Sequence, residues 1–154
     1  MEKLKLGSSI PSFKSIDQLG NEIHSENLRG KKVVIYFYPK DNTPGCTAQA
    51  CSVRDSIETL TEKGITVIGI STDSIASHKK FSDKYELPFS LLADEEKELC
   101  NAFGIWGEKK FMGKVYDGIH RTSFLFDESS QLIAVIEKPN TKDHGNEILK
   151  NYEL

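Results

Sequence analysis

Two apolar segments with a helical pattern between them constrain the fold of this chain more than any other feature. Val33 to Tyr38 and Ile65 to Ser71 are rich in β-branched and aromatic residues, which is typical of buried strands. Between them, apolar residues recur at helical spacing, at Ala48, Ala50, Val53, Ile57 and Leu60. Strands joined through a helix run parallel, so residues 33–70 predict a βαβ unit and an α/β fold.

The segments on either side of this unit predict a thioredoxin-like arrangement. Within residues 1–31, short apolar pieces around a Gly20-Asn21 turn signal predict an N-terminal β-hairpin. The later predicted elements are a helix over 74–86, a strand over 89–92, a helix over 95–103 that Asp94 caps, extended segments over 110–116, 122–126 and 131–137, and a last helix from about Asp143. We therefore predict an α/β, thioredoxin-like fold with a central mixed β-sheet flanked by helices.

Length and charge narrow the class of protein. With 154 residues, of which 38% are hydrophobic, the chain is expected to form a single domain over residues 1–154. The 20 basic and 23 acidic residues give a net charge of −3 without a basic block, so neither nucleic acid nor a membrane is expected as a partner. No apolar run reaches the roughly 20 residues of a membrane-spanning helix. These features, with only three cysteines, predict a cytoplasmic protein rather than a secreted disulfide scaffold.

The junction between the first strand and the following helix places a cysteine in a reactive position. Thr43 suits the N-cap, Pro44 the first helical position and Gly64 the stop, so the predicted helix continues to residue 63 and Cys46 lies in its first turn. Unpaired N–H groups and the helix dipole favour an anion there, and a thiolate is the nucleophilic form of cysteine. Cys46 is therefore a candidate nucleophile; the alternative is a small buried hydrophobic residue.

The segment YFYPKDNTPGCTAQAC resembles the peroxiredoxins, in particular the bacterioferritin comigratory protein (PrxQ-type) branch. The family pattern of Pro, three residues, Thr, two residues and Cys is met by Pro39, Thr43 and Cys46. The likeness covers nearly the whole chain and includes the segments PSFKSIDQLGNEI, TVIGISTDS and GIHRTSFLFD. The resemblance implies a thioredoxin fold and a thiol peroxidase that acts on peroxides.

The resemblance also implies roles for individual residues. Cys46 would attack a peroxide oxygen and become a sulfenic acid, Thr43 would hydrogen-bond the peroxide and the thiolate, and Pro39 would shield the thiolate from water. Arg121 would complete the site. Thiolate attack on an O–O bond leaves negative charge on the departing oxygen, so a fixed cation that cannot lose its proton, such as Arg121, suits that position.

Cys51 lies five residues after Cys46, where this branch commonly has its resolving cysteine. In an intact helix five residues rise about 7.5 Å, which puts the two Cα atoms roughly 8 to 9 Å apart. A disulfide needs less than about 7 Å. If the two cysteines pair during turnover, we predict that oxidation unwinds roughly residues 44 to 52. The alternative is that Cys51 is an inert core thiol.

The remaining cysteine and the histidines carry no assigned chemistry. Cys100 departs from the family pattern and is expected to pack at the edge of an apolar face, with a minor role as an alternative resolving thiol left open. His78 is expected at the edge of the helix over 74–86, and His120 beside the site as a neighbour of Arg121. No function is assigned to His144. The four histidines lack metal-ligand spacing, so no metal site is predicted.

Other redox classes fit less well. A thioredoxin-type oxidoreductase needs Cys-x-x-Cys, and a plant-type iron–sulfur protein needs four cysteines with one at the position of Arg54. The resemblance instead implies a peroxidase without a cofactor, often monomeric, that reduces hydrogen peroxide and organic hydroperoxides and is regenerated by thioredoxin or a similar dithiol. The alternative is a non-enzymatic redox sensor that signals by oxidation-driven local unfolding.

Overall fold

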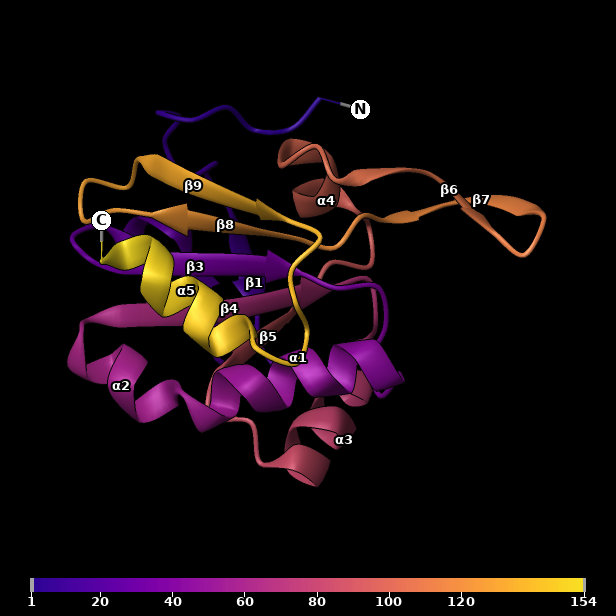
Figure 1. The fold of residues 1–154 in the computed structure, drawn as a ribbon, viewed down its shortest axis with the longest axis horizontal. Helices are drawn as coiled ribbons and strands as arrows, with labels where there is room; N and C mark the ends of the chain where they lie inside the picture. Colours follow the sequence, from indigo (N-terminus) through magenta and orange to yellow (C-terminus); the bar gives the residue numbers. More distant parts are fainter. Residues whose placement is uncertain (1, 154) are drawn as a thin grey trace.

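A five-stranded mixed sheet with strand order β5-β4-β3-β8-β9 forms the centre of the computed structural model, which describes residues 2–153 (Figure 1). Two further two-stranded sheets, β1-β2 and β6-β7, lie outside it. In chain order the elements are β1 (Lys14–Ile16), β2 (Glu22–His24), the 3₁₀ helix η1 (Ser25–Leu28), β3 (Lys32–Phe37), α1 (Pro44–Asp55), α2 (Ile57–Glu62), β4 (Ile65–Ser71), α3 (Ile75–Tyr85), β5 (Ser90–Ala93), α4 (Glu98–Ala102), β6 (Trp106–Phe111), β7 (Lys114–Ile119), β8 (Thr122–Phe126), β9 (Leu132–Glu137) and α5 (His144–Tyr152).

The strand directions confirm the predicted fold. β3 pairs in parallel with β4, and β4 pairs in parallel with β5, so the predicted βαβ unit is present. β8 runs antiparallel to β3 and pairs with β9 as a hairpin, which makes the sheet mixed. The N-terminal hairpin is also confirmed, because β1 and β2 pair antiparallel on either side of the Gly20 turn. The arrangement is the predicted thioredoxin-like one.

The central sheet separates two apolar cores. Successive side chains of β3 point to opposite faces: Val33, Ile35 and Phe37 enter one core, whereas Val34 and Tyr36 enter the other. The first core packs under η1, α4 and the N-terminal segment, and the second packs under α1, α2, α3 and α5 (Figure 1). No helix within residues 2–153 is long and apolar enough to cross a membrane.

The predicted helix from residue 44 to Gly64 is interrupted. α1 ends at Asp55 and α2 begins at Ile57, because the N–H of Ser56 turns back to the carbonyls of Val53 and Arg54. The start of α5 packs against this point: a Cβ on Gly145 would lie 2.8 Å from the carbonyl oxygen of Ser52. The expectation of one continuous helix was therefore wrong.

Two other boundaries differ from the prediction. The helix predicted over 95–103 begins only at Glu98, because both oxygens of the Asp94 carboxylate accept backbone N–H groups from the first turn. The segment 110–116 is not one extended strand. It contains the turn of the β6–β7 hairpin, where Met112 and Gly113 have φ angles of 50° and 80°. This hairpin projects beyond the central sheet (Figure 1).

Candidate active site

Cys46 lies in the first turn of α1, immediately after the loop that follows β3. Thr43 occupies the N-cap position in extended conformation, Pro44 is the first helical residue, and the N–H of Thr47 donates to the carbonyl of Thr43 over 2.8 Å. The Cys46 thiol is free and only 2% exposed. The predicted helix start is confirmed, and it places this sulfur at the positive end of the helix dipole.

Arg121 is brought to Cys46 from a distant part of the sequence. It lies between β7 and β8, and its Nη2 is 3.4 Å from the sulfur of Cys46. Gly45 provides the space for it, because a Cβ at this position would lie 3.2 Å from Arg121 Nη2. The structure therefore brings together the cysteine and the cation that the sequence singled out.

Gln49 is a site residue that sequence reasoning missed. It lies one turn after Cys46 on α1, is fully buried, and accepts a hydrogen bond of 2.7 Å from Arg121 Nη1 through Oε1. Its amide nitrogen and the hydroxyl of Tyr36 are buried without a partner among the described residues. The sequence offers only the helical spacing of Gln49 from Cys46, which does not show that the side chain is buried beside Arg121. Gln49 fixes the orientation of the Arg121 fork.

Pro39 and Thr43 flank the loop before Cys46. Pro39 is half-buried and directly follows Tyr38, which is fully buried. The Thr43 hydroxyl donates to the carbonyl of Lys40 over 2.8 Å and makes no capping bond to the helix. With the thiol reduced, the Thr43 hydroxyl thus bridges the loop to Lys40, and its oxygen can still accept a hydrogen bond. The roles that the resemblance implies for these two residues stay predictions.

A second cation, Lys109 on β6, lies near Arg121. Its Nζ donates to the carbonyl of Ile119 over 2.8 Å. Burial lowers the pKa of Lys109, and the charge of Arg121 lowers it further. The ring of His120 contacts the carbonyl oxygen of Glu108 over 3.0 Å. These contacts tie the base of the β6–β7 hairpin to the segment that carries Arg121.

The other two cysteines have different surroundings. Cys51 is half-buried near the middle of α1, and both it and Cys46 are free thiols. Cys100 is fully buried in the first core, whereas Cys46 lies in the second, so the sheet separates them. Burial and a hydrogen bond to Asp94 raise the pKa of Cys100 well above its ordinary value. The expected packing role of Cys100 therefore fits its position, although it lies within the core and not at an edge.

Two histidines are fully buried, and one of them, His78, lies deeper than the sequence suggested. His78, expected at the edge of its helix, is fully buried in a polar cluster, because α3 turns this residue toward β5. His144, at the start of α5, is fully buried as well and contacts Ser123 and Glu147 over 2.8 and 2.9 Å.

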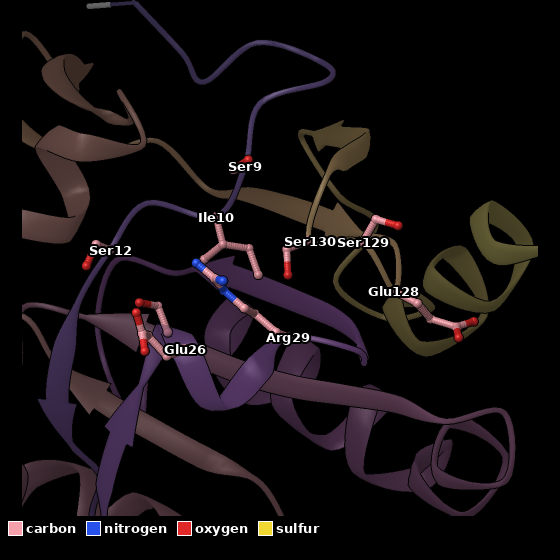
Figure 2. Close-up of a pocket in the computed structure, with 9 residues that line it drawn as sticks. Ser9, Ile10, Ser12, Glu26, Arg29, Glu128, Ser129 and Ser130 are labelled. Atoms are coloured by element: carbon pink, nitrogen blue, oxygen red, sulfur yellow. The ribbon is translucent and has the colours of Figure 1, made fainter.

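A cavity of about 440 Å³ lies outside the Cys46 site (Figure 2). It opens between the N-terminal segment, η1 and the turn after β8, and Arg29 reaches into it beside Glu26. It shares no residue with the Cys46 site; its lining consists of Ser9, Ile10, Ser12, Ser25, Glu26, Arg29, Glu128, Ser129 and Ser130.

Comparisons with known proteins agree with this geometry. The AhpC/TSA family model matches residues 6–135. Peroxiredoxin Bcp of Escherichia coli is 45% identical over 149 residues, covering 97% of this chain and 96% of the relative, and that of Bacillus subtilis is 43% identical over 147 residues, covering 96% and 94%. Among solved structures, the bacterioferritin comigratory protein of Xanthomonas campestris superposes with a TM-score of 0.86 at 31% identity, covering 92% of this chain and 90% of that one. A mutant of Xylella fastidiosa PrxQ superposes with a TM-score of 0.93 at 25% identity, covering 99% and 98%. Because these matches extend over nearly the whole chain, the protein belongs to the AhpC/TSA family and, within it, to the Bcp (PrxQ) peroxiredoxins.

Proposed function

We propose that this peroxiredoxin is a thiol peroxidase whose attacking atom is the sulfur of Cys46. The observation that carries the proposal is the contact of 3.4 Å between Arg121 Nη2 and this sulfur at the start of α1. The thiolate attacks one peroxide oxygen, the O–O bond breaks, and the departing oxygen leaves with the bonding pair and takes up a proton. The products are a Cys46 sulfenic acid and water or an alcohol.

The surroundings of Cys46 suit the charge changes of this step. Negative charge moves from sulfur to the departing oxygen, so donors that already face this region lower the barrier. Arg121 directs Nη2 of its planar fork at the sulfur, and Gln49 holds the fork in place through Nη1. Thr43 would position the peroxide, and Pro39 would keep water from the thiolate.

Cys51 would resolve the sulfenic acid. Its thiolate attacks the Cys46 sulfur, the S–O bond breaks, and the departing hydroxide takes up a proton to leave as water, so the product is an intramolecular disulfide. A dithiol, thioredoxin or a similar protein, would then reduce the disulfide, which requires a reducing compartment such as the cytoplasm. The residues proposed for the reaction all lie on one chain, so we propose that a monomer suffices. The Xanthomonas relative's described alkyl peroxide reduction supports organic hydroperoxides as substrates besides hydrogen peroxide.

Cys100 is an unsuitable resolving thiol. It lies across the sheet from Cys46, and its raised pKa disfavours the thiolate that attack on a sulfenic acid needs.

The test is peroxide consumption in the presence of thioredoxin, thioredoxin reductase and NADPH. We expect many turnovers in the native protein, none in Cys46→Ser, a sharp reduction in Cys51→Ser, and native rates in the control Cys100→Ser. Normal turnover by Cys51→Ser would show that an external thiol resolves Cys46. Consumption of a single equivalent by the native protein would favour the redox sensor.

A further inference from the structure

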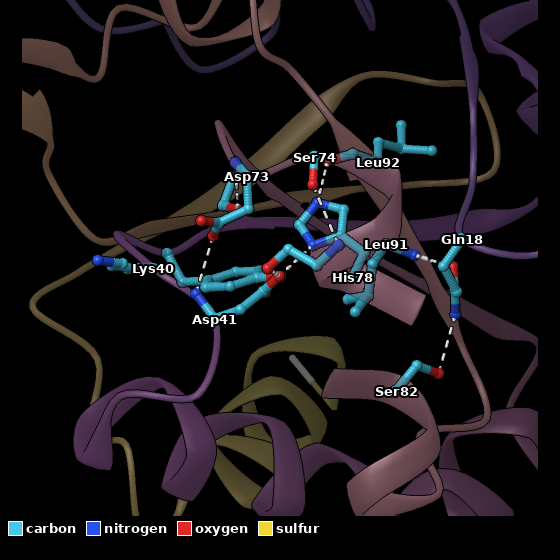
Figure 3. Close-up of polar contacts among 12 residues, drawn as sticks. Gln18, Lys40, Asp41, Asp73, Ser74, His78, Ser82, Leu91 and Leu92 are labelled. Atoms are coloured by element: carbon cyan, nitrogen blue, oxygen red, sulfur yellow. Dashed lines mark hydrogen bonds and ion pairs between the residues drawn. The ribbon is translucent and has the colours of Figure 1, made fainter. Parts of the chain in front are cut away.

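A buried polar cluster holds the loop that leads to Cys46 (Figure 3). Asp41, between β3 and α1, meets His78 from α3 and Asp73 from the turn after β4. We call these three residues the Asp41 clamp. Asp41 is 7% exposed and His78 is fully buried. Charged groups at this depth are costly unless they are paired, so their contacts decide what the cluster does.

Asp41 is held through both its side chain and its backbone. Its carboxylate accepts from the hydroxyl of Tyr38 over 2.6 Å, the hydroxyl of Ser77 over 2.8 Å and Nδ1 of His78 over 2.7 Å. Its backbone N–H donates to the Asp73 carboxylate over 2.8 Å. One loop residue is thereby connected to Tyr38 directly after β3, to α3 and to the turn after β4.

The same atoms could be considered as metal ligands, because Asp41, Asp73 and His78 offer ligand atoms within 4.8 Å of one another. Proton donors already occupy both carboxylate oxygens of Asp41 and one, Oδ2, of Asp73. Ser71 donates to the Asp73 carboxylate over 2.7 Å, in addition to the Asp41 N–H. These residues therefore fit a hydrogen-bonded cluster better than a metal site.

The contacts of His78 define its protonation. Nε2 lies 2.9 Å from the carbonyl oxygen of Leu92, which can only accept, and Nδ1 faces the Asp41 carboxylate. A ring with hydrogen on both nitrogens satisfies both acceptors, so the geometry favours an imidazolium at this position. His144 provides the contrast, because its Nε2 faces the hydroxyl of Ser123, which can donate to a neutral ring.

Asp41 is the matching anion. Burial acts to raise the pKa of Asp41, but the hydrogen bonds from His78 and Tyr38 and the charge of His78 outweigh it and leave the pKa below its ordinary value. Carboxylate and imidazolium thus form a closed ion pair. Removal of either partner would leave a buried charge uncompensated.

The position of this pair in the chain gives it a role at the site. Asp41 lies between Pro39 and Thr43, and Asn42 after it turns the chain with a φ of 59°. The helix that carries Cys46 begins immediately afterwards. We propose, building on the proposed peroxidase function, that the Asp41–His78 ion pair is a positioning device for Cys46. It holds the loop in the geometry for peroxide attack and sets the N-terminal limit of the segment that unwinds when Cys46 pairs with Cys51.

The test separates two rates in single-turnover experiments: attack of Cys46 on peroxide, and formation of the disulfide that follows. In His78→Leu we expect peroxide attack to slow by roughly ten- to a hundredfold, because small displacements of reacting groups have effects of this size. Disulfide formation should stay as fast as in the native protein or become faster, because the loop opens more readily. Asp41→Asn, which keeps the shape of the side chain, should move both rates in the same directions by smaller factors.

The matched control is Gln18→Leu, one turn further along α3 at Ser82. Gln18 is buried and bonds Ser82 of α3, the carbonyl of Phe89 and the N–H of Leu91, without contact to Asp41 (Figure 3). Its loss should lower the free energy of unfolding but leave both rates within about twofold of native values. Equal slowing in Gln18→Leu and His78→Leu would mean that the clamp only stabilises the fold, and unchanged rates in His78→Leu would overturn the proposal.

Two measurements are independent of peroxidase activity. Nitrogen NMR of the native protein at neutral pH should show both His78 ring nitrogens protonated; a bare nitrogen would overturn the ion pair. Amide hydrogen exchange of reduced His78→Leu and Asp41→Asn should be faster over residues 42–50, but not in Gln18→Leu. If the native protein fails to consume peroxide while these amides exchange as expected, the proposed peroxidase function is wrong but the Asp41 clamp still holds the loop. Unchanged exchange in both His78→Leu and Asp41→Asn would reject the clamp itself.

Discussion

Arg121 joins two acceptors of different kinds, a sulfur and an amide oxygen, and this double contact fixes its direction. Nη2 faces the sulfur of Cys46 while Nη1 donates to Gln49. A lysine would carry the same charge as a single point without the planar fork. The guanidinium geometry, and not charge alone, is therefore what the site holds in place.

We accordingly expect Arg121→Lys to retain only part of the function. Peroxide attack should slow by about 10²-fold, the size of effect seen when one preorganised donor is lost from an active site. The single-turnover rate of Cys46 oxidation is the measurement. In Gln49→Ala the rate of peroxide attack should decrease less, because the charge of Arg121 remains and only the orientation of its guanidinium is no longer fixed. A native rate in Arg121→Lys would show that charge alone suffices.

At the residue scale, the sequence fails to predict those site residues whose role depends on tertiary contacts. The motif singles out Cys46, and the helix start around it follows from local capping preferences. Gln49 and Lys109 could not be found in this way, because their importance arises only when β6 and β8 are brought beside α1. The predicted position of His78 at the helix edge was wrong, because helical periodicity does not show which polar residue finds a buried partner.

At the scale of elements, α1 has to change shape for the proposed chemistry. Cys46 and Cys51 belong to the same uninterrupted helix, in which residues five apart are roughly 8 to 9 Å apart at Cα. Amide hydrogen exchange of the disulfide form should therefore show loss of protection over residues 44 to 52 relative to the reduced form.

The control for this prediction is Cys51→Ser, in which oxidation of Cys46 cannot form the pair. Its amides over the same residues should stay protected after one equivalent of peroxide. Equal protection of both redox forms of the native protein would show that the helix accommodates oxidation without unwinding.

Element types were predictable from the sequence, whereas some element boundaries were not. The continuous apolar runs of β3 and β4 leave little choice except buried parallel strands. The break at Ser56 lies where Gly145 of α5, which is remote in sequence, packs against the helix. Likewise, the turn at Met112 and Gly113 lies within a stretch whose composition suits a strand.

At the scale of the whole molecule, the buried His144 gives the fold a pH dependence. Burial lowers the pKa of His144, and the hydrogen bond and charge of Glu147 offset this only in part. Below its ordinary value of about 6.5, the unfolded chain binds a proton that the folded chain excludes. The contribution of His144 to stability is therefore present above that pH and is lost as the pH falls toward the folded value.

Urea unfolding at several pH values between 7.5 and 5 measures this effect. We expect the free energy of unfolding of the native protein to decrease with falling pH, and the decrease to be smaller in His144→Gln. Gln18→Leu is the control, because it loses buried hydrogen bonds without removing a titratable group, so its slope should match that of the native protein. Identical slopes in the native protein and His144→Gln would show that His144 does not titrate differently on folding.

The division of the interior by the sheet has a consequence for the speed of the catalytic cycle. α1 packs on one side of the sheet only, so in the proposed cycle the sheet and the opposite core would persist as a template while the first turns of α1 unwind. Helix formation in short segments takes about 0.1 to 1 μs, far less than a typical encounter with a substrate or protein partner. Return to the reduced shape would then not limit the proposed cycle, and its pace would be set by the chemical steps and by how often peroxide and reductant arrive.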